Sequence, residues 1–188
     1  MRHALVLTIA VSGATLLAGC GHSPAATFLT IDAAPPAAAP LADYGGAPLR
    51  VPFVHVPVAL DRPEYVRQMT AGTIAVDDFA RWSAPLGRLA RDTLVRDLTQ
   101  RLAGGSVLAP DAAPAHSETV VQATVLDVTM IGTTATMTVS YGIGPSPRPT
   151  VIQLTTPLAG AAPVDSARAW SALIGQLADR IVADLPAR

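Results

Sequence analysis

The 188-residue sequence contains little of what many protein chemistries need. It has a single cysteine, two tryptophans, three tyrosines, three phenylalanines and no lysine, so all thirteen basic residues are arginine. One cysteine allows neither an intrachain disulfide nor a CxxC metal or redox motif. The formal net charge of −1 leaves no basic excess for binding nucleic acid. No P-loop and no G-x-S-x-G elbow occur, so any ATP would be hydrolysed by another protein.

After residue 17 the sequence also lacks an apolar run of the roughly 20 residues that a membrane span requires. Before that point, Met1-Arg2-His3 forms a short basic start and residues 4–17 form a mostly apolar stretch. Two small residues, Ala18 and Gly19, then precede the cysteine at position 20. This is the three-part layout of a secretory signal peptide, and it predicts that residues 1–19 are removed on export.

The run Leu17-Ala18-Gly19-Cys20 resembles the lipobox of bacterial lipoproteins. The resemblance implies a thioether-linked diacylglycerol on Cys20, cleavage before it, and an N-acyl chain on the new amino terminus. Two or more acyl chains anchor a protein stably in a membrane, and we expect no cofactor besides this covalent lipid. The alternative is a short transmembrane helix followed by a chance cysteine, which fourteen apolar-rich residues are too few to form.

The sequence after residue 19 predicts one domain on a short tether. Residues 20–26 form the lipidated tether, and residues 27–188 are long enough for a single domain with its own core. Within it, residues 33–48 are rich in proline and alanine and predict a loop. Gly21 stands where an aspartate would retain a lipoprotein in the inner membrane of enterobacteria, so we expect anchoring at the periplasmic face of the outer membrane.

Two segments have the three- and four-residue apolar spacing of amphipathic helices. The first runs from Leu86 to Leu102, with Ser83 as the expected cap, and the second begins at Asp165 or Ser166. Four arginines of the first helix fall outside its apolar set and are expected in solvent: Arg88, Arg91, Arg96 and Arg101.

Several segments favour strands: residues 27–32, 49–58 with an interruption at Pro52, 118–128, 134–141 and 150–155. Residues 65–69 and 73–76 predict a hairpin, followed by a short helical turn that Asp77 and Asp78 would cap. The order of elements predicts an α/β fold, a two-layer sandwich with a mixed, mostly antiparallel sheet and two long helices on one face.

Three stretches together resemble the PqiC-like family of ABC-type transport auxiliary lipoproteins. They are Thr27-Phe28-Leu29-Thr30-Ile31-Asp32, the stretch Val56 to Val66 with Leu60-Asp61-Arg62-Pro63 inside it, and Phe79-Ala80-Arg81-Trp82-Ser83-Ala84-Pro85-Leu86. The resemblance implies a non-catalytic docking lipoprotein of a paraquat-inducible (Pqi-like) system that maintains membrane integrity. Its partners would be a periplasmic MCE-domain protein and inner-membrane transport components that move lipids or other hydrophobic molecules.

No cluster of residues in the sequence predicts catalysis or metal binding. His55 and His116 are too far apart to suggest a metal pair by spacing, and no metal ligand is assigned. Asp61, Arg62 and Pro63 are expected to fix a turn or to meet a partner. Phe79 and Trp82 are expected in the core, with exposed contact to a partner as the alternative.

Two other functions stay open at this point. The chain could itself carry a lipid or another hydrophobic ligand in a cavity between sheet and helices. An envelope hydrolase is the least favoured interpretation, because the sequence shows no pattern of catalytic residues. The sequence does not decide the oligomeric state, and a homo-oligomer remains open.

Overall fold

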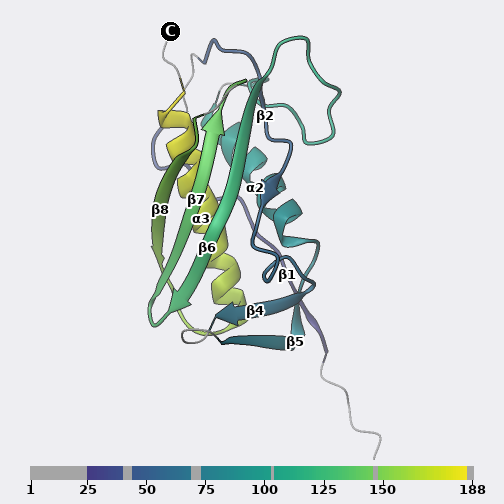
Figure 1. Cartoon of the computed structure of the whole chain (residues 1–188), viewed down its shortest axis with the longest axis vertical. Helices are drawn as coiled ribbons and strands as arrows, with labels where there is room; N and C mark the ends of the chain where they lie inside the picture. Colours follow the sequence, from purple (N-terminus) through teal and green to yellow (C-terminus); the bar gives the residue numbers. More distant parts are fainter. Residues whose placement is uncertain (1–24, 40–43, 69–72, 103, 146–147, 186–188) are drawn as a thin grey trace, which may run out of the picture.

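The computed structural model describes residues 25–39, 44–68, 73–102, 104–145 and 148–185 (Figure 1). The expected signal peptide, the lipobox residues Leu17, Ala18 and Gly19, and the lipidation site Cys20 lie outside these residues. No helix in the described part of the chain has the length and apolarity that a membrane span requires.

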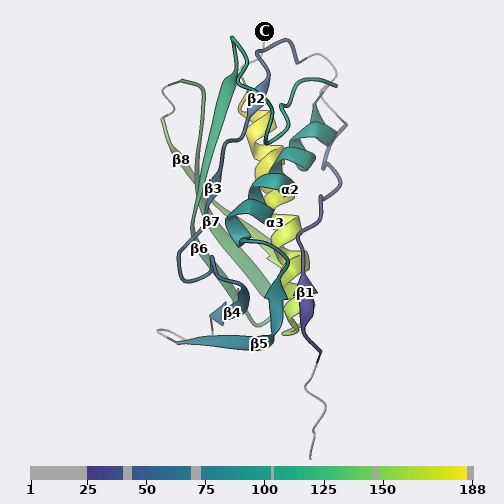
Figure 2. The same ribbon diagram turned by 90° about the vertical axis from the view of Figure 1, so that its right-hand side faces the viewer.

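The main body is a five-stranded sheet covered on one face by two helices, α2 (Leu86–Arg101) and α3 (Pro163–Ala183). Strands β6 (Thr119–Ile131), β7 (Thr134–Ile143) and β8 (Thr150–Pro157) form an antiparallel meander. The short strands β2 (Leu49–Arg50) and β3 (Val54–His55) both pair parallel with β6 at the sheet's edge. Figure 2 shows the sheet and the helices as two layers, which confirms the predicted architecture.

A second, three-stranded sheet lies at one end of the helices. Its order is β1 (Thr27–Leu29), β5 (Ile74–Trp82) and β4 (Glu64–Gln68), with β1 parallel and β4 antiparallel to β5. The expectation of a single sheet is therefore wrong, because the strands form two sheets. Strand pairing is a contact between distant segments, and the local apolar pattern of each strand carries no information about its partner.

The predicted apolar faces form the core. Alternate residues of β6 and β7 are buried against the helices, namely Val121, Ala123, Val125, Ala135, Met137, Val139 and Tyr141. The helices and the residues just after them bury most of their predicted stripes against this face, namely Leu86, Ala90, Leu94, Leu98, Leu102, Trp170, Leu173, Ile174, Leu177, Ile181 and Leu185. Leu89, also expected there, is only partly buried. The opposite face of β6 and β7 presents mainly threonine, serine and glutamine, as expected for an antiparallel sheet with one wet face.

The helical turn expected after Asp77 is wrong, because strand β5 continues through it to Trp82. Asp77 still acts as a local acceptor: its Oδ1 atom receives the backbone N–H groups of Phe79 (2.9 Å) and Ala80 (3.0 Å). The register against β4 shifts at this point. A side chain that caps backbone groups can therefore produce an irregularity within a strand as well as a helix start.

The expected helix caps are also wrong. The N-cap residues of the two helices, Pro85 and Ala162, make no side-chain capping hydrogen bond, and α3 begins with Pro163. Pro163 suits the first position of α3 because its fixed φ fits the first turn and its missing N–H would have no partner there. Ser166 is instead buried, and its Oγ atom lies 2.5 Å from the hydroxyl of Tyr65.

Candidate interaction site

The three stretches that carry the family resemblance meet at one place in the structure. The backbone N–H of Trp82 donates to the carbonyl of Pro63 (2.8 Å), and the N–H of Ser83 donates to the carbonyl of Leu29 (2.8 Å). Asp61 Oδ1 accepts the N–H of Gly87 (3.2 Å). We call this meeting point, formed by residues 29, 61–63 and 82–87, the motif junction.

Asp61 supplies the cap that helix α2 lacks locally. Its carboxylate accepts from Gly87 in the first turn, where free N–H groups and the positive end of the helix dipole favour a negative charge. A Cβ atom on Gly87 would lie 2.8 Å from the carbonyl oxygen of Val54, so strand β3 passes too close for any side chain at position 87. Asp61 therefore ties its loop to the start of α2, and its role in contacting a partner stays a prediction.

Arg62 pairs with Glu64 across the same turn. The Arg62 Nε atom donates to Glu64 Oε2 at 3.0 Å, and this hydrogen bond lowers the pKa of the Glu64 carboxyl. Both side chains keep contact with solvent, and Arg62 is the more exposed. An exposed ion pair contributes little to stability, so Arg62 is available for contacts outside the chain.

Phe79 and Trp82 lie close in sequence but in different surroundings. Trp82 is buried, with its ring edge-on to Tyr65 at a centroid distance of 6.2 Å, so its expected place in the core is confirmed. Phe79 is 50 % exposed, and its expected place in the core is wrong. The register shift between β4 and β5 changes which residues of β5 face inward, and periodicity alone does not reveal it.

An open groove of about 360 Å³ lies beside the motif junction. Its walls come from β3 and the two residues before it, the Asp61 turn, the first turns of α2 and the loop before β6: Pro52, Phe53, Val54, Asp61, Gly87, Arg88, Arg91 and Asp111. By contrast, a pocket between β4, β6 and the helices that Trp82 and Trp170 line holds only about 20 Å³. That space fits about one water molecule.

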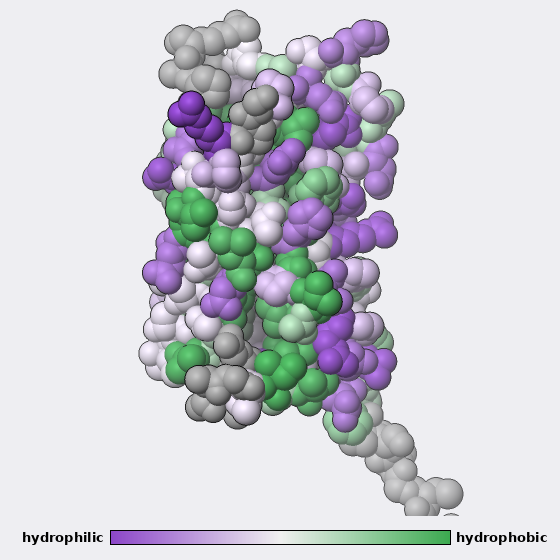
Figure 3. All heavy atoms as spheres, viewed as in Figure 1, coloured by the Kyte–Doolittle hydropathy of each residue, from purple (hydrophilic) through white to green (hydrophobic). Residues whose placement is uncertain are grey.

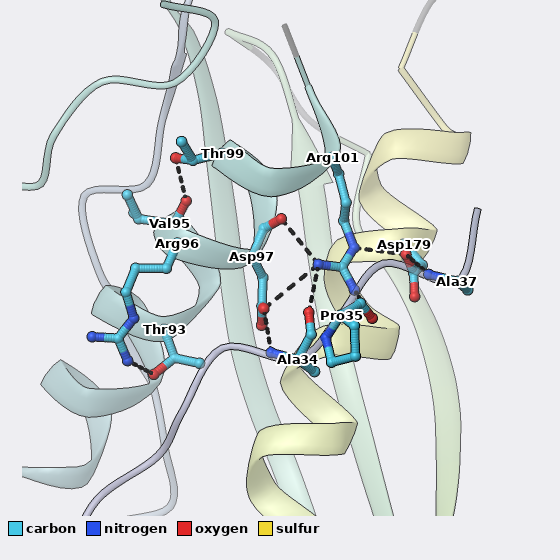
Figure 4. A network of polar contacts seen from close by, with 10 residues as sticks. All are labelled: Ala34, Pro35, Ala37, Thr93, Val95, Arg96, Asp97, Thr99, Arg101 and Asp179. Atoms are coloured by element: carbon cyan, nitrogen blue, oxygen red, sulfur yellow. Dashed lines mark hydrogen bonds and ion pairs between the residues drawn. The ribbon is translucent and has the colours of Figure 1, made fainter. Parts of the chain in front are cut away.

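A second cluster, which the sequence analysis missed, holds the segment that follows β1. We call residues 31–37 the strap. In Figure 4 the side chains of α2 and α3 point at its backbone: Ala34 N–H donates to Asp97 Oδ1 (2.7 Å) and Ala37 N–H to Asp179 Oδ1 (3.3 Å). Arg101 donates to the carbonyls of Ala34 (3.2 Å) and Pro35 (3.3 Å).

Arg101 is 3 % exposed, which corrects its expected place in solvent. Its guanidinium lies between two carboxylates, 2.6 Å from Asp179 Oδ1 and 3.5 Å from Asp97 Oδ1. Burial raises the pKa of Asp97 to about 6, against the lowering effects of the Ala34 N–H and Arg101. Among the described residues, Asp97 Oδ2 has no hydrogen-bond partner.

The described residues show no arrangement that would hold a metal ion. No group of three or more His, Cys, Asp or Glu side chains converges in this part of the chain. His55 lies on β3 with its ring 4.4 Å from that of Phe53, and His116 lies in the loop before β6. At the motif junction and the strap, the polar groups bind other parts of the chain, so both clusters hold segments together.

A family model described as "ABC-type transport auxiliary lipoprotein component" matches residues 29–182. The chain belongs to this family. The match begins in β1 and ends near the close of α3, so it includes the motif junction, the strap and both helices. As a member of the family, the protein is an auxiliary lipoprotein of a transport system.

Solved structures share this fold at low sequence identity. A crystal structure of an uncharacterised protein superposes with a TM-score of 0.65 and 15 % identity, covering 87 % of this chain and 100 % of its own. Protein XCC0632 from Xanthomonas campestris, assigned to family DUF330, gives a TM-score of 0.58 and 17 % identity, covering 83 % and 91 %. No curated protein matches the sequence.

Proposed function

We propose that this auxiliary lipoprotein is acylated at Cys20, stays at the periplasmic face of the outer membrane, and is a non-catalytic docking component of an MCE-type transport system. Its partners would be a periplasmic MCE-domain protein and inner-membrane transport components. The cargo would be lipids or other hydrophobic molecules.

The observation that carries this proposal is the family match over residues 29–182. The lipobox at Leu17 to Cys20 and the glycine at position 21 support a lipid anchor and its outer-membrane location. Asp61, Asp97 and Arg101 each form hydrogen bonds to other segments of the chain, so these polar residues stabilise the fold. This supports a docking role and not a catalytic one.

The partner surface that we propose is the exposed rim of the motif junction. Asp61, Arg62 and Pro63 are exposed there, next to the open groove between β3 and α2. The groove carries both charges, with Arg88 and Arg91 on one wall and Asp111 on another. Mixed charge at a rim favours a protein partner with complementary charges and sets the specificity of the contact.

The alternative role, a carrier with its own lipid cavity, has less support. Ligand pockets generally enclose about 300–1,000 Å³, whereas the pocket beside Trp82 and Trp170 holds about 20 Å³. The groove at the motif junction has sufficient volume, about 360 Å³, but it is open to solvent. A lipid that copurifies at one molecule per chain would favour the carrier.

Chemical cross-linking in native envelopes, followed by affinity purification and mass spectrometry, tests the proposal. We expect an MCE-domain protein among the cross-linked partners and a diacylglycerol adduct on Cys20. Arg62→Ala should reduce the cross-linked yield, while Arg168→Ala, which removes an equally charged exposed side chain on α3, should not. Recovery of acylated protein without any transport component would overturn the proposal.

A further inference from the structure

The exposed apolar side chains gather at one end of the molecule. This end, at the bottom of Figures 1 and 2, is formed by the sheet β1-β5-β4, the C-terminal end of β6 and the N-terminal end of α3. Ten large apolar side chains are exposed among the described residues, and six belong to these elements: Phe28, Ile74, Val76, Phe79, Ile131 and Val164. We call this the tether end.

Charged residues surround these apolar side chains. Figure 3 shows hydrophobic residues gathered over β4 and β5 at the bottom of the view, with hydrophilic residues beside them. Arg81 lies directly across from Phe28 in the β1–β5 pairing, and Asp78 is exposed on β5. Exposed apolar patches with a polar rim mark interaction surfaces, including those for membranes.

The short stretch of chain between Cys20 and β1 limits how far the tether end can lie from the bilayer. Seven residue steps separate Cys20 from Thr27, the first residue of β1, and seven steps span at most about 25 Å when fully extended. Helix α3 has 21 residues and extends about 30 Å from the tether end toward the opposite end. A lipid on Cys20 therefore keeps the tether end closest to the bilayer.

We propose that the tether end lies on the lipid surface that carries the anchor, with Phe28 and Phe79 in the interfacial layer. Phe28 is 68 % exposed and follows the tether directly, so the first strand after the lipid already presents an aromatic side chain. This inference rests on the proposed acylation of Cys20. In this arrangement Phe79 contacts lipid, and the rim formed by residues 61–63 binds protein partners.

Site-directed spin labelling of the full acylated chain in vesicles of phosphatidylethanolamine and phosphatidylglycerol tests the inference. Cys20 is the only cysteine and its thiol would carry lipid, so a cysteine introduced elsewhere is the only free thiol. Phe79→Cys and Ile131→Cys place labels on two elements of the tether end. Val151→Cys is the matched control, because Val151 is 60 % exposed and Ile131 is 59 % exposed, but Val151 lies at the other end of the sheet.

We expect the ratio of collisions with oxygen to collisions with an aqueous nickel chelate to be several-fold higher at positions 79 and 131 than at 151. Equal ratios at all three positions on acylated, vesicle-bound protein would overturn the inference and leave the proposed function intact. Shielding of position 79 only after a transport component is added would also overturn it, because this end would then bind protein. Protein without lipid on Cys20 would overturn both proposals.

Discussion

The strap and the five-stranded sheet lie on opposite sides of helices α2 and α3, as Figure 2 shows, and are held by different kinds of contact. The sheet presents buried apolar side chains such as Val125, Met137 and Val139 to the helices. Apart from Ile31, whose side chain is buried in the core, the strap presents mainly backbone. Its N–H and carbonyl groups bind polar side chains of both helices, including Asp97, Arg101 and Asp179.

The difference follows from composition. At its start the strap is anchored by Ile31, whose side chain is fully buried in the core. The rest of the strap contains Ala33, Ala34, Pro35, Pro36 and Ala37, whose small side chains bury too little apolar area to hold this part by the hydrophobic effect. Hydrogen bonds from the helices hold these residues instead. Each such bond weakens steeply when its geometry is disturbed. The sheet's attachment is therefore spread over many residues, while that of the strap depends on a few.

Replacing Arg101 should break the strap's attachment and give the largest effect. Arg101→Leu leaves the carboxylates of Asp97 and Asp179 without their buried cation, and removing one partner of a buried pair costs about 3–5 kcal/mol. Urea unfolding would measure the loss. Hydrogen exchange should show the amides of Ala34 and Ala37 unprotected before those of the sheet.

The matched control is Leu98→Ala, one turn away on the same helix and fully buried. It should cost about 2–5 kcal/mol through cavity formation, with no selective exposure of the strap. A loss below about 1 kcal/mol for Arg101→Leu would mean that the strap is held by something other than its polar contacts.

The next effect concerns pH. Burial raises the pKa of Asp97 in the folded protein to about 6, above its ordinary value of 3.8, so the folded protein binds more protons than the unfolded chain between these values. The contribution of Asp97 to the free energy of unfolding is fully present below pH 3.8 and is lost as pH rises through 6. At 1.36 kcal/mol per pKa unit, the difference is about 3 kcal/mol.

The measurement compares wild type with Asp97→Asn by urea unfolding at pH 7 and pH 4.5. The stability of wild type relative to the variant should rise as pH falls. This subtraction removes carboxyls such as Glu64 and Glu118, whose pKa values are lowered by arginine partners and whose contributions therefore fall in acid. A difference that is constant with pH would contradict the raised pKa of Asp97.

The contrast between strap and sheet also marks what the sequence could predict. Local periodicity identified the buried faces of β6, β7, α2 and α3, because one apolar face repeats in each element. It could not identify the strap's attachment, because those contacts join residues more than sixty positions apart, as between Ala34 and Asp97. The same limit hid the division into two sheets and the shift that exposes Phe79.

One signal for the missed cluster was present. Ala90, Leu94, Asp97 and Arg101 follow one another at spacings of four, three and four, so the two charged residues continue the buried stripe of α2. A charged pair on an apolar stripe is buried at high cost unless each member has partners. At the motif junction the family motifs drew attention to Asp61, but only the structure placed it at the N-terminus of α2.

The third prediction tests how closely the strap fits the helices. A Cβ atom on Gly175 of α3 would lie 2.6 Å from the Cβ of Ala34 and 3.5 Å from Arg101 Nη2. Gly175→Ala should therefore lower the free energy of unfolding by about 1–3 kcal/mol, although alanine is the better helix former. Thermal or urea unfolding would measure this loss.

Two further variants sharpen the test. Ala34→Gly in the Gly175→Ala background should recover much of the lost stability, because it removes the atom that the new methyl group would meet. Gly104→Ala is the control, since a Cβ there meets nothing within 4 Å. Equal losses at positions 104 and 175 would show that the close contact between α3 and the strap is absent.

The smallest effect should come from Arg88, which shares helix α2 with Arg101 but faces solvent. Its side chain is 64 % exposed and its Nε atom lies 3.7 Å from Asp92 Oδ2, a pair of the kind that contributes little because water screens it. Arg88→Ala should change the free energy of unfolding by no more than about 0.5 kcal/mol in urea. If Arg88→Ala cost nearly as much stability as Arg101→Leu, arginines on α2 in general would hold this side of the molecule. That result would refute the claim that the strap's contacts do so.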